Sequence, residues 1–156
     1  MLTKNKKGFT LIEVVLVLAI AGLIFLVVFL ALPALQRSQR DQQRRQDMAK
    51  FMSQVTTYST NNQGNVPEDD TGSKGVNAFV SRYLAVSGEQ FNDPSSGSPY
   101  KVEDKTGSLS DKPGVGGIFY FRGATCEGES VISEAGNRNV AIITQMEGGS
   151  YFCQNN

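Results

Sequence analysis

The sequence of 156 residues contains no histidine and only two cysteines. The cysteines do not form a C-x-x-C pair, so the usual ligand sets for zinc and haem are missing. Neither a G-x-S-x-G motif nor a phosphate-binding loop occurs. We therefore expect no metal, no cofactor and no catalytic site, and we interpret the chain as a structural or binding protein and not as an enzyme.

Charge is absent from one long stretch of the chain. From Val14 to Leu35, 22 consecutive residues carry no charged or polar side chain. A helix of that length spans roughly 33 Å, close to the hydrocarbon thickness of a bilayer. Glu13 stands at the edge of this stretch, although a charge at the bilayer centre costs about 2.5–3.5 kcal/mol even on translocon-based scales. The apolar stretch predicts a transmembrane helix, and Glu13 needs a partner there.

The formal net charge of zero hides an uneven distribution. Three lysines precede residue 8, and five cations against two acids lie between residues 36 and 63. From residue 64 onward seven Lys and Arg stand against twelve Asp and Glu. An acidic body is a poor electrostatic match for nucleic acid, so we expect no direct nucleic-acid partner.

The segment after the apolar stretch changes from uniformly polar to periodic. Residues 36–47 (QRSQRDQQRRQD) contain no apolar side chain, and we interpret their basic residues as a solvated or inter-subunit helix face. The next apolar residues recur at helical spacing, which predicts a helix with one buried stripe: Met48, Phe51, Met52, Val55 and Tyr58. We expect one helix from Phe9 to about Thr60, roughly 78 Å long, ended by the NNQGN segment.

The remaining residues predict a small body with strands. Apolar spacing from residue 76 to residue 84 indicates a short helix. Strand-forming residues are concentrated at 100–102, 117–121, 139–145 and 150–154. Gly-Gly pairs at 116–117 and 148–149 mark turns. The fold class is therefore α+β, with three or four antiparallel strands packed on the later half of a long helix.

Three interpretations compete for the front of the chain. The first is a cleaved signal peptide, for which Ala19-Ile20-Ala21 has the form of a cleavage site, but cutting there would leave an apolar new N-terminus. A simple membrane anchor explains the length of the apolar stretch but explains neither Gly8 nor Glu13. The stretch Lys6-Lys7-Gly8-Phe9-Thr10-Leu11-Ile12-Glu13 resembles the processing and assembly motif of type IV pilins and pseudopilins.

The resemblance implies a role for each residue of the motif. Residues 1–8 would be a leader, removed after Gly8 by the membrane-bound prepilin peptidase. The new N-terminal amine of Phe9 would be methylated. Glu13, the fifth residue after the cut, would direct assembly by pairing with the amine of a neighbouring subunit. The mature chain would divide into a membrane and filament-core helix (9–35), its amphipathic continuation (36–62) and a head domain (63–156).

Gly22 and Pro33 interrupt the aliphatic pattern. Both residues are common in transmembrane helices, but a proline removes a backbone donor and predicts a kink at Pro33. Filaments of the resembled family lose helicity between a glycine and a proline in this region. Those two residues lie closer together in the family than Gly22 and Pro33 do here.

Cys126 and Cys153 are expected to form a disulfide if the body lies outside the cytoplasm. Closing that loop stabilises a fold by roughly 3.6 kcal/mol in the chain-entropy model. The flanking charges do not decide the orientation of the helix, since both flanks are basic. The cysteine pair and a cytoplasmic leader both favour an external body.

The resulting hypothesis is a prepilin that assembles into a type IV pilus, a helical polymer of identical subunits on the cell surface. Its partners would be the lipid bilayer, the prepilin peptidase, and the assembly platform with its ATPase. A pseudopilin of a secretion or DNA-uptake system is the first alternative. The Asp-Pro loop at 92–100 favours the pseudopilin. Some pseudopilins bind calcium, and a calcium site here would use Asp104 and Asp111, although these residues lack the ordered spacing of calcium ligands. The second alternative is a single-pass anchored binding domain.

Overall fold

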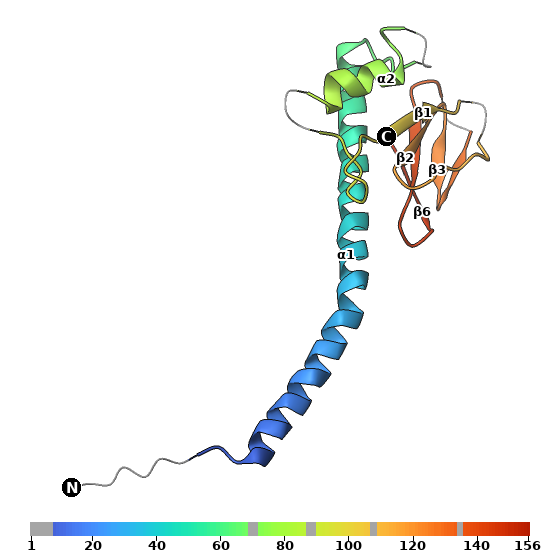
Figure 1. Ribbon diagram of the computed structural model, residues 1–156. Helices are drawn as coiled ribbons and strands as arrows, with labels where there is room; N and C mark the ends of the chain where they lie inside the picture. The colour runs from blue at the N-terminus through green and yellow to red at the C-terminus, as the bar shows by residue number, and fades with distance from the viewer. Residues whose placement is uncertain (1–7, 69–71, 87–89, 107–108, 134–135) are drawn as a thin grey trace. The chain divides into compact units, whose positions relative to one another are not determined.

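The computed structural model describes residues 8–68, 72–86, 90–106, 109–133 and 136–156. Most of the predicted leader, residues 1–7, lies outside these ranges. The chain divides into two compact units, Met1–Ser38 and Gln39–Asn156. Helix α1 (Leu11–Asn61) begins in the first unit and ends in the second (Figure 1).

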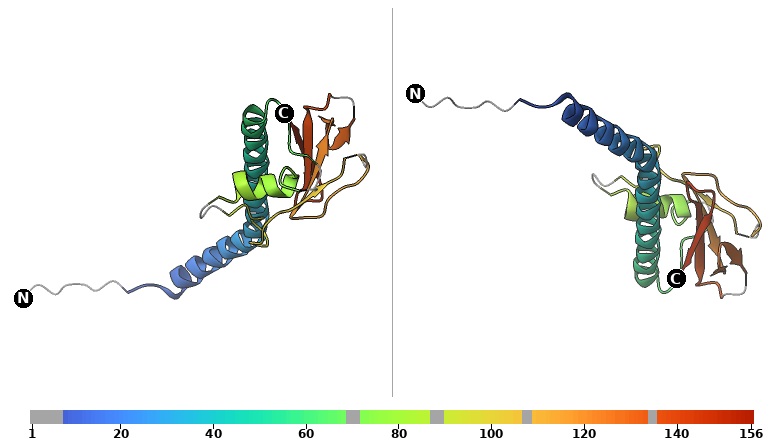
Figure 2. Two further views of the ribbon diagram at one scale, coloured as in Figure 1. Left: turned by 90° about the horizontal axis from the view of Figure 1, so that it is seen from above. Right: turned by 90° about the horizontal axis from the view of Figure 1, so that it is seen from below.

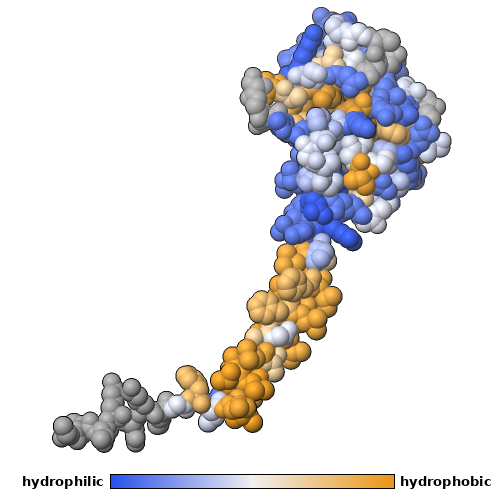
Figure 3. All heavy atoms as spheres, viewed as in Figure 1, coloured by the Kyte–Doolittle hydropathy of each residue, from blue (hydrophilic) through white to orange (hydrophobic). Residues whose placement is uncertain are grey.

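The first unit presents an almost entirely apolar helix surface. Its large aliphatic and aromatic side chains are exposed, with Phe9 at 89% and Leu30 at 74%. Figure 3 shows hydrophobic residues over most of this segment. Among the described residues, α1 is the one helix that is long and apolar enough to cross a membrane. Such a surface is unstable in water and requires lipid or other protein as its environment.

Helix α1 continues without interruption through Gly22 and Pro33. The backbone therefore does not lose helicity between these two residues. Pro33 still cannot donate the hydrogen bond that the carbonyl of Phe29 would receive in a regular helix. The kink at this position stays a prediction.

A mixed four-stranded sheet forms the centre of the second unit. The strands are β1 (Lys101–Asp104), β2 (Gly117–Arg122), β5 (Val140–Gln145) and β6 (Tyr151–Asn155), in the order β1-β2-β5-β6. The pairs β2–β5 and β5–β6 are antiparallel. Strand β1 is parallel to β2, with Lys101 opposite Gly117, so the expectation of an all-antiparallel sheet was wrong at this edge. A loop returns the chain to the starting end of β1 before β2 begins, and such a return produces parallel pairing.

A short hairpin that was not predicted from the sequence covers part of the sheet. It consists of β3 (Thr125–Glu127) and β4 (Ser130–Ile132). With three residues in each strand, its sequence is too short for a clear period-two pattern. The structure joins Cys126 of β3 to Cys153 of β6 in a disulfide, with a Cα–Cα distance of 5.7 Å. The bridge fastens the hairpin to the last strand of the chain.

The sheet buries both of its faces. Successive residues of β2 point to opposite sides, as a pleated strand requires. Ile118 and Tyr120 belong to the core cluster between α1 and the sheet, and Phe121 belongs to the cluster beneath the hairpin. Figure 2 shows in both views that the sheet and the later part of α1 lie side by side. The second unit is therefore three layers deep, from helix through sheet to hairpin.

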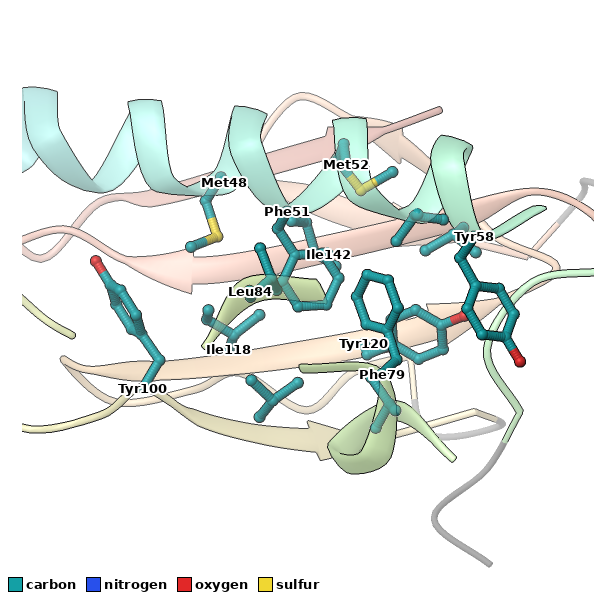
Figure 4. Close-up of a cluster of buried hydrophobic side chains, with 14 of the residues drawn as sticks. Met48, Phe51, Met52, Tyr58, Phe79, Leu84, Tyr100, Ile118, Tyr120 and Ile142 are labelled. Atoms are coloured by element: carbon teal, nitrogen blue, oxygen red, sulfur yellow. The ribbon is translucent and has the colours of Figure 1, made fainter. Parts of the chain in front are cut away.

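The predicted helical stripe is part of the main core. Met48, Phe51, Met52, Val55 and Tyr58 are all buried. The Phe51 ring packs edge-on against Phe79 of the short helix α2 (Val76–Phe79), at a centroid distance of 5.4 Å (Figure 4). A π-helical turn η1 (Val80–Leu84) follows α2 and contributes buried Leu84. These aromatic contacts add to the burial of apolar area that holds the second unit together.

Candidate functional site

Two polar sites stand out, and the first lies at the start of α1. Gly8, Phe9 and Thr10 precede the helix, which begins at Leu11. Gly8 has open space around it, since a side chain added there meets no atom within 4 Å. The Phe9 ring is 89% exposed. The peptide bond between Gly8 and Phe9 is thus accessible in a non-helical segment, as a peptidase substrate requires.

Thr10 and Glu13 form a reciprocal cap at the N-terminus of α1. The backbone N–H of Thr10 donates to Glu13 Oε2 at 2.9 Å, and the Thr10 hydroxyl donates to the same oxygen at 2.8 Å. The backbone N–H of Glu13 approaches Thr10 Oγ1 at 3.4 Å. This is a capping box, in which two otherwise unpaired backbone donors of the first turn receive acceptors. The sequence signal for this cap is T-x-x-E before an apolar run, and Thr10 was not predicted to have a role.

The carboxylate of Glu13 lies at the edge of an apolar hollow. The hollow is shallow and is lined by Phe9, Glu13, Val14, Val17 and Leu18. One carboxylate oxygen, Oε2, accepts the hydrogen bonds from Thr10. An ionised carboxylate has more acceptor positions than these bonds use. Acceptor capacity and an apolar lining therefore occur together at this position.

The second site is an ion-pair cluster in the second unit. Arg44 is fully buried, and its Nε lies 2.7 Å from Asp93 Oδ1. Its Nη1 lies 2.9 Å from Asp41 Oδ1, and its Nη2 lies 2.8 Å from Ser95 Oγ. One turn earlier, Arg40 makes two bonds to Glu147, at 2.5 and 2.7 Å.

This cluster corrects one expectation. The basic residues of 36–47 were interpreted as a solvated or inter-subunit helix face, which is wrong for Arg40 and Arg44. Their partners come from the 92–96 loop and from the turn between β5 and β6, which the fold brings against the helix. Charged groups are buried only when they are paired, and here the pairs are bidentate or multiply bonded.

The carboxylate of Asp93 has two functions within the cluster. Oδ1 binds Arg44, while Oδ2 accepts hydrogen bonds from the backbone N–H groups of Ser95 and Ser96, at 3.2 and 3.1 Å, and from the Ser95 hydroxyl. Burial alone would raise the pKa of Asp93, but the bonds from Arg44 and Ser95 outweigh burial and lower it. The hydrogen bonds from Arg40 likewise hold the pKa of Glu147 below its ordinary value. The Asp-Pro loop is therefore fixed to α1 by charge.

A neighbouring pair has the opposite electrostatic behaviour. The Tyr100 hydroxyl donates to Asp47 Oδ2 at 3.0 Å. Burial raises the pKa of Asp47 more than this bond lowers it. Burial also raises the pKa of the Tyr100 hydroxyl, which stays protonated and able to donate. The end of the loop is thereby attached to the same helix as its beginning.

The two acids considered for calcium are engaged in other contacts. Asp104 Oδ1 accepts hydrogen bonds from the backbone and hydroxyl of Thr106, at 2.9 and 2.6 Å. Asp111 lies 3.6 Å from the ammonium group of Lys105. Within the described ranges, no three residues of the metal-binding types are grouped closely enough to hold an ion.

Comparison with known proteins gives a match at the first site. Residues 3–29 match the prokaryotic N-terminal methylation motif. The matched segment includes Gly8, Phe9, Glu13 and Gly22, and it ends before Pro33. No curated protein and no solved structure matches the chain.

Proposed function

Because the motif at residues 3–29 is the prepilin signal of type IV pilins and pseudopilins, we propose that this chain is the precursor of a subunit of a type IV pilus. The signal points to a structural subunit and not to an enzyme. The observation that carries the proposal is the coincidence of the motif with an accessible Gly8–Phe9 bond and an exposed apolar helix. The mature subunit would comprise residues 9–35 as the core helix, 36–62 as its continuation and 63–156 as the head.

Maturation would proceed by cleavage after Gly8 and methylation of the Phe9 amine. A glycine at the cut allows close approach of the substrate backbone to the peptidase. Methylation keeps the amine cationic, so the mature N-terminus still carries a charge next to an apolar ring. Before assembly, the subunit would be held in the membrane by residues 9–35, with its head outside.

Assembly would join the Phe9 amine of one subunit to the Glu13 carboxylate of the next. The hollow around Glu13 combines the required acceptor with apolar walls. In a low-dielectric environment an ion pair of this kind is strongly preferred over either charge alone. The exposed apolar surface of the helix would bundle with other copies, and the head-to-tail contact would extend without closing. An assembly platform and its ATPase would drive the process.

A pseudopilin of a secretion or DNA-uptake system is the second candidate. The observation in its favour is the Asp-Pro loop, which Arg44 and Ser95 order through Asp93. The disulfide between β3 and β6 favours a pilus subunit exposed outside the cell. Electron microscopy of cells producing the chain separates the two, since only a pilus subunit forms long surface filaments.

Intact-mass measurement of the mature protein tests the proposal. We expect the loss of residues 1–8 and the gain of one methyl group on Phe9. The matched control is Gly8→Val, whose side chain blocks backbone approach and should leave the leader attached. A full-length chain with its leader in a cell that has an active prepilin peptidase would refute the proposal and support the anchored binding domain.

A further inference from the structure

A polar hollow lies at the C-terminal end of α1. It has a volume of about 270 Å³, and one charge of each sign, from Glu68 and Lys74, lies in its wall. Of the described residues that line it, Val66 alone is aliphatic. Four consecutive or nearly consecutive amides also line it: Asn61, Asn62, Gln63 and Asn65. Neither the prepilin motif nor the ion-pair cluster uses this hollow, so its role is separate from both.

A buried tyrosine contributes an unused hydroxyl to the hollow. Tyr58 is 8% exposed, and its ring packs edge-on against Phe79 and Tyr83, each at a centroid distance of 5.6 Å. Figure 4 shows the Tyr58 hydroxyl directed away from the buried cluster. Within the described ranges this hydroxyl has no hydrogen-bond partner, although its residue lines the hollow. An unpaired polar group on a buried side chain needs a partner, which a bound polar molecule can supply.

The turn after α1 is ordered without any ligand. A side-chain N–H of Asn62 donates to the Tyr58 carbonyl at 2.8 Å, and a side-chain N–H of Asn65 donates to the Asn62 carbonyl at 3.0 Å. These bonds hold the turn and leave the amide oxygens as acceptors. Gln63 has a φ of 59°, a left-handed conformation that favours glycine. Backbone strain of this kind is concentrated at functional sites, so the glutamine side chain is retained where glycine would be more stable.

The charges of the hollow do not select an ion. The backbone N–H of Glu68 donates to the Lys74 carbonyl at 2.9 Å, which holds the two residues side by side. In the described part of the chain, their side chains form no ion pair with each other. Their charges cancel in sum, so Coulomb attraction favours neither an anion nor a cation. A ligand of this hollow is therefore recognised by hydrogen bonds.

We propose that this hollow binds a neutral sugar. A sugar ring presents several hydroxyl groups, each of which donates one hydrogen bond and accepts others. The four amides supply donors and acceptors together, while Glu68 supplies acceptors and Lys74 supplies donors. Burial and the nearby Glu68 carboxylate raise the pKa of Tyr58, so its hydroxyl stays protonated and can donate.

Size and polarity narrow the ligand further. The volume is just below the range of roughly 300–1,000 Å³ that is typical of ligand sites, so the occupant is about the size of one sugar unit. An apolar ligand would displace water from the amides without replacing its hydrogen bonds, which is costly. The site belongs to the head and is complete within one copy of the chain, so the inference does not rest on the proposed function.

Fluorine NMR of the full-length chain tests this inference. A phosphocholine detergent is required, because detergents with sugar head groups would compete. Labelling with fluorotyrosine places reporters at all five tyrosines, residues 58, 83, 100, 120 and 151, each assigned by its Tyr→Phe variant. The probes are glucose, galactose and N-acetylglucosamine. At least one should shift the Tyr58 resonance saturably, with a Kd of about 1 mM, and leave Tyr100 and Tyr151 unchanged.

The absence of a saturable shift at Tyr58 with all three sugars would overturn the inference. Charged counterparts of the probes test the class of ligand: glucuronate, galacturonate and glucosamine. The counterpart of a sugar that binds should bind about tenfold more weakly, because its charge loses water without gaining a partner. A counterpart that binds as tightly as the neutral sugar, or more tightly, would overturn the assignment of a neutral ligand.

A substitution in the turn locates the site. Gln63→Gly removes one amide and relieves the left-handed backbone, so it should weaken sugar binding about fivefold without lowering the melting temperature. Gln46→Ala, an exposed glutamine of α1 outside the hollow, is the matched control and should bind as the parent chain does. Equal binding by the two variants would overturn the inference. Binding is measured on the uncleaved single chain, so failure of cleavage or assembly would count against the proposed function alone.

Discussion

Arg44 of α1 and Asp93 of the Asp-Pro loop form a buried ion pair, with 2.7 Å between Nε and Oδ1. The two residues are 49 positions apart in the sequence. Their pairing fixes the loop before β1 against the helix, and Glu147 joins the turn after β5 to the same arginine at 3.4 Å. The first turns of α1 in the second unit are therefore attached to the body by charge, and the later turns by apolar packing.

Replacing Arg44 should destabilise the body strongly. Arg44→Ala leaves the Asp93 carboxylate buried without its cation, which costs about 3–5 kcal/mol of unfolding free energy. All five tyrosines lie at or beyond residue 58, so near-ultraviolet circular dichroism of the detergent-solubilised chain reports on the body. Arg45→Ala, an exposed control that loses only its contact with Phe152, should cost about 1 kcal/mol or less. Equal losses of unfolding free energy for the two substitutions would show that the buried pair stabilises the body no more than the exposed contact does.

The ion-pair cluster predicts a stability that falls in acid. The pKa values of Asp93 and Glu147 are lowered in the folded state. Their contribution is complete above the ordinary values of 3.8 and 4.5, and it is lost as the pH falls through the lower folded values. Asp47 has a raised pKa, so it has the opposite effect on stability: its protonation as the pH falls relieves the cost of burying a carboxylate.

Thermal unfolding measured between pH 7 and pH 2 checks this balance. The melting temperature should change little down to about pH 4.5 and then fall steeply. Asp47→Asn should remove the stabilisation that protonation of Asp47 provides in acid, and the melting temperature should still fall steeply. A melting temperature that stays constant below pH 4 would contradict the assigned pKa directions.

The stripe on α1 predicts a large effect at Phe51. The ring is fully buried among Phe79, Phe91 and Tyr120. Phe51→Ala should lower the free energy of unfolding by roughly 3–5 kcal/mol, through lost transfer energy and the cavity left behind. Ser53→Ala, two positions away and exposed, is the control and should be within about 0.5 kcal/mol of the parent chain. An unchanged melting temperature for Phe51→Ala would place the ring outside the core.

Substitutions at Glu13 and Thr10 should separate docking from capping. Glu13→Gln retains a side chain that can complete the capping box but lacks the charge, so it should insert, be cleaved after Gly8 and assemble poorly. Thr10→Ala removes the hydroxyl cap, at about 0.5–2 kcal/mol, and keeps the carboxylate, so it should still assemble. The amount of polymer per cleaved subunit is the measurement. Normal assembly by Glu13→Gln would mean that the carboxylate is not the docking group.

Local features of this protein were predictable from the sequence alone. The length of the apolar stretch, the motif around Gly8 and Glu13, and the stripe from Met48 to Tyr58 are each contained within a few helical turns. Their physical causes are the thickness of a bilayer and the period of a helix, which act on neighbouring residues. The long helix, the small sheet on its later half and most strand positions followed from these patterns.

Tertiary structure decided what depends on residues far apart in the chain. The burial of Arg44 required Asp93 and Glu147, which are 49 and 103 positions away, and without them an arginine among glutamines is indistinguishable from a solvated one. The parallel pairing of β1 depended on the path of the loop that follows it. The hairpin of β3 and β4 is too short to show a period and is held by a bridge to the last strand. A sequence pattern records the environment of a residue only when that environment repeats along the chain, and these three contacts do not repeat.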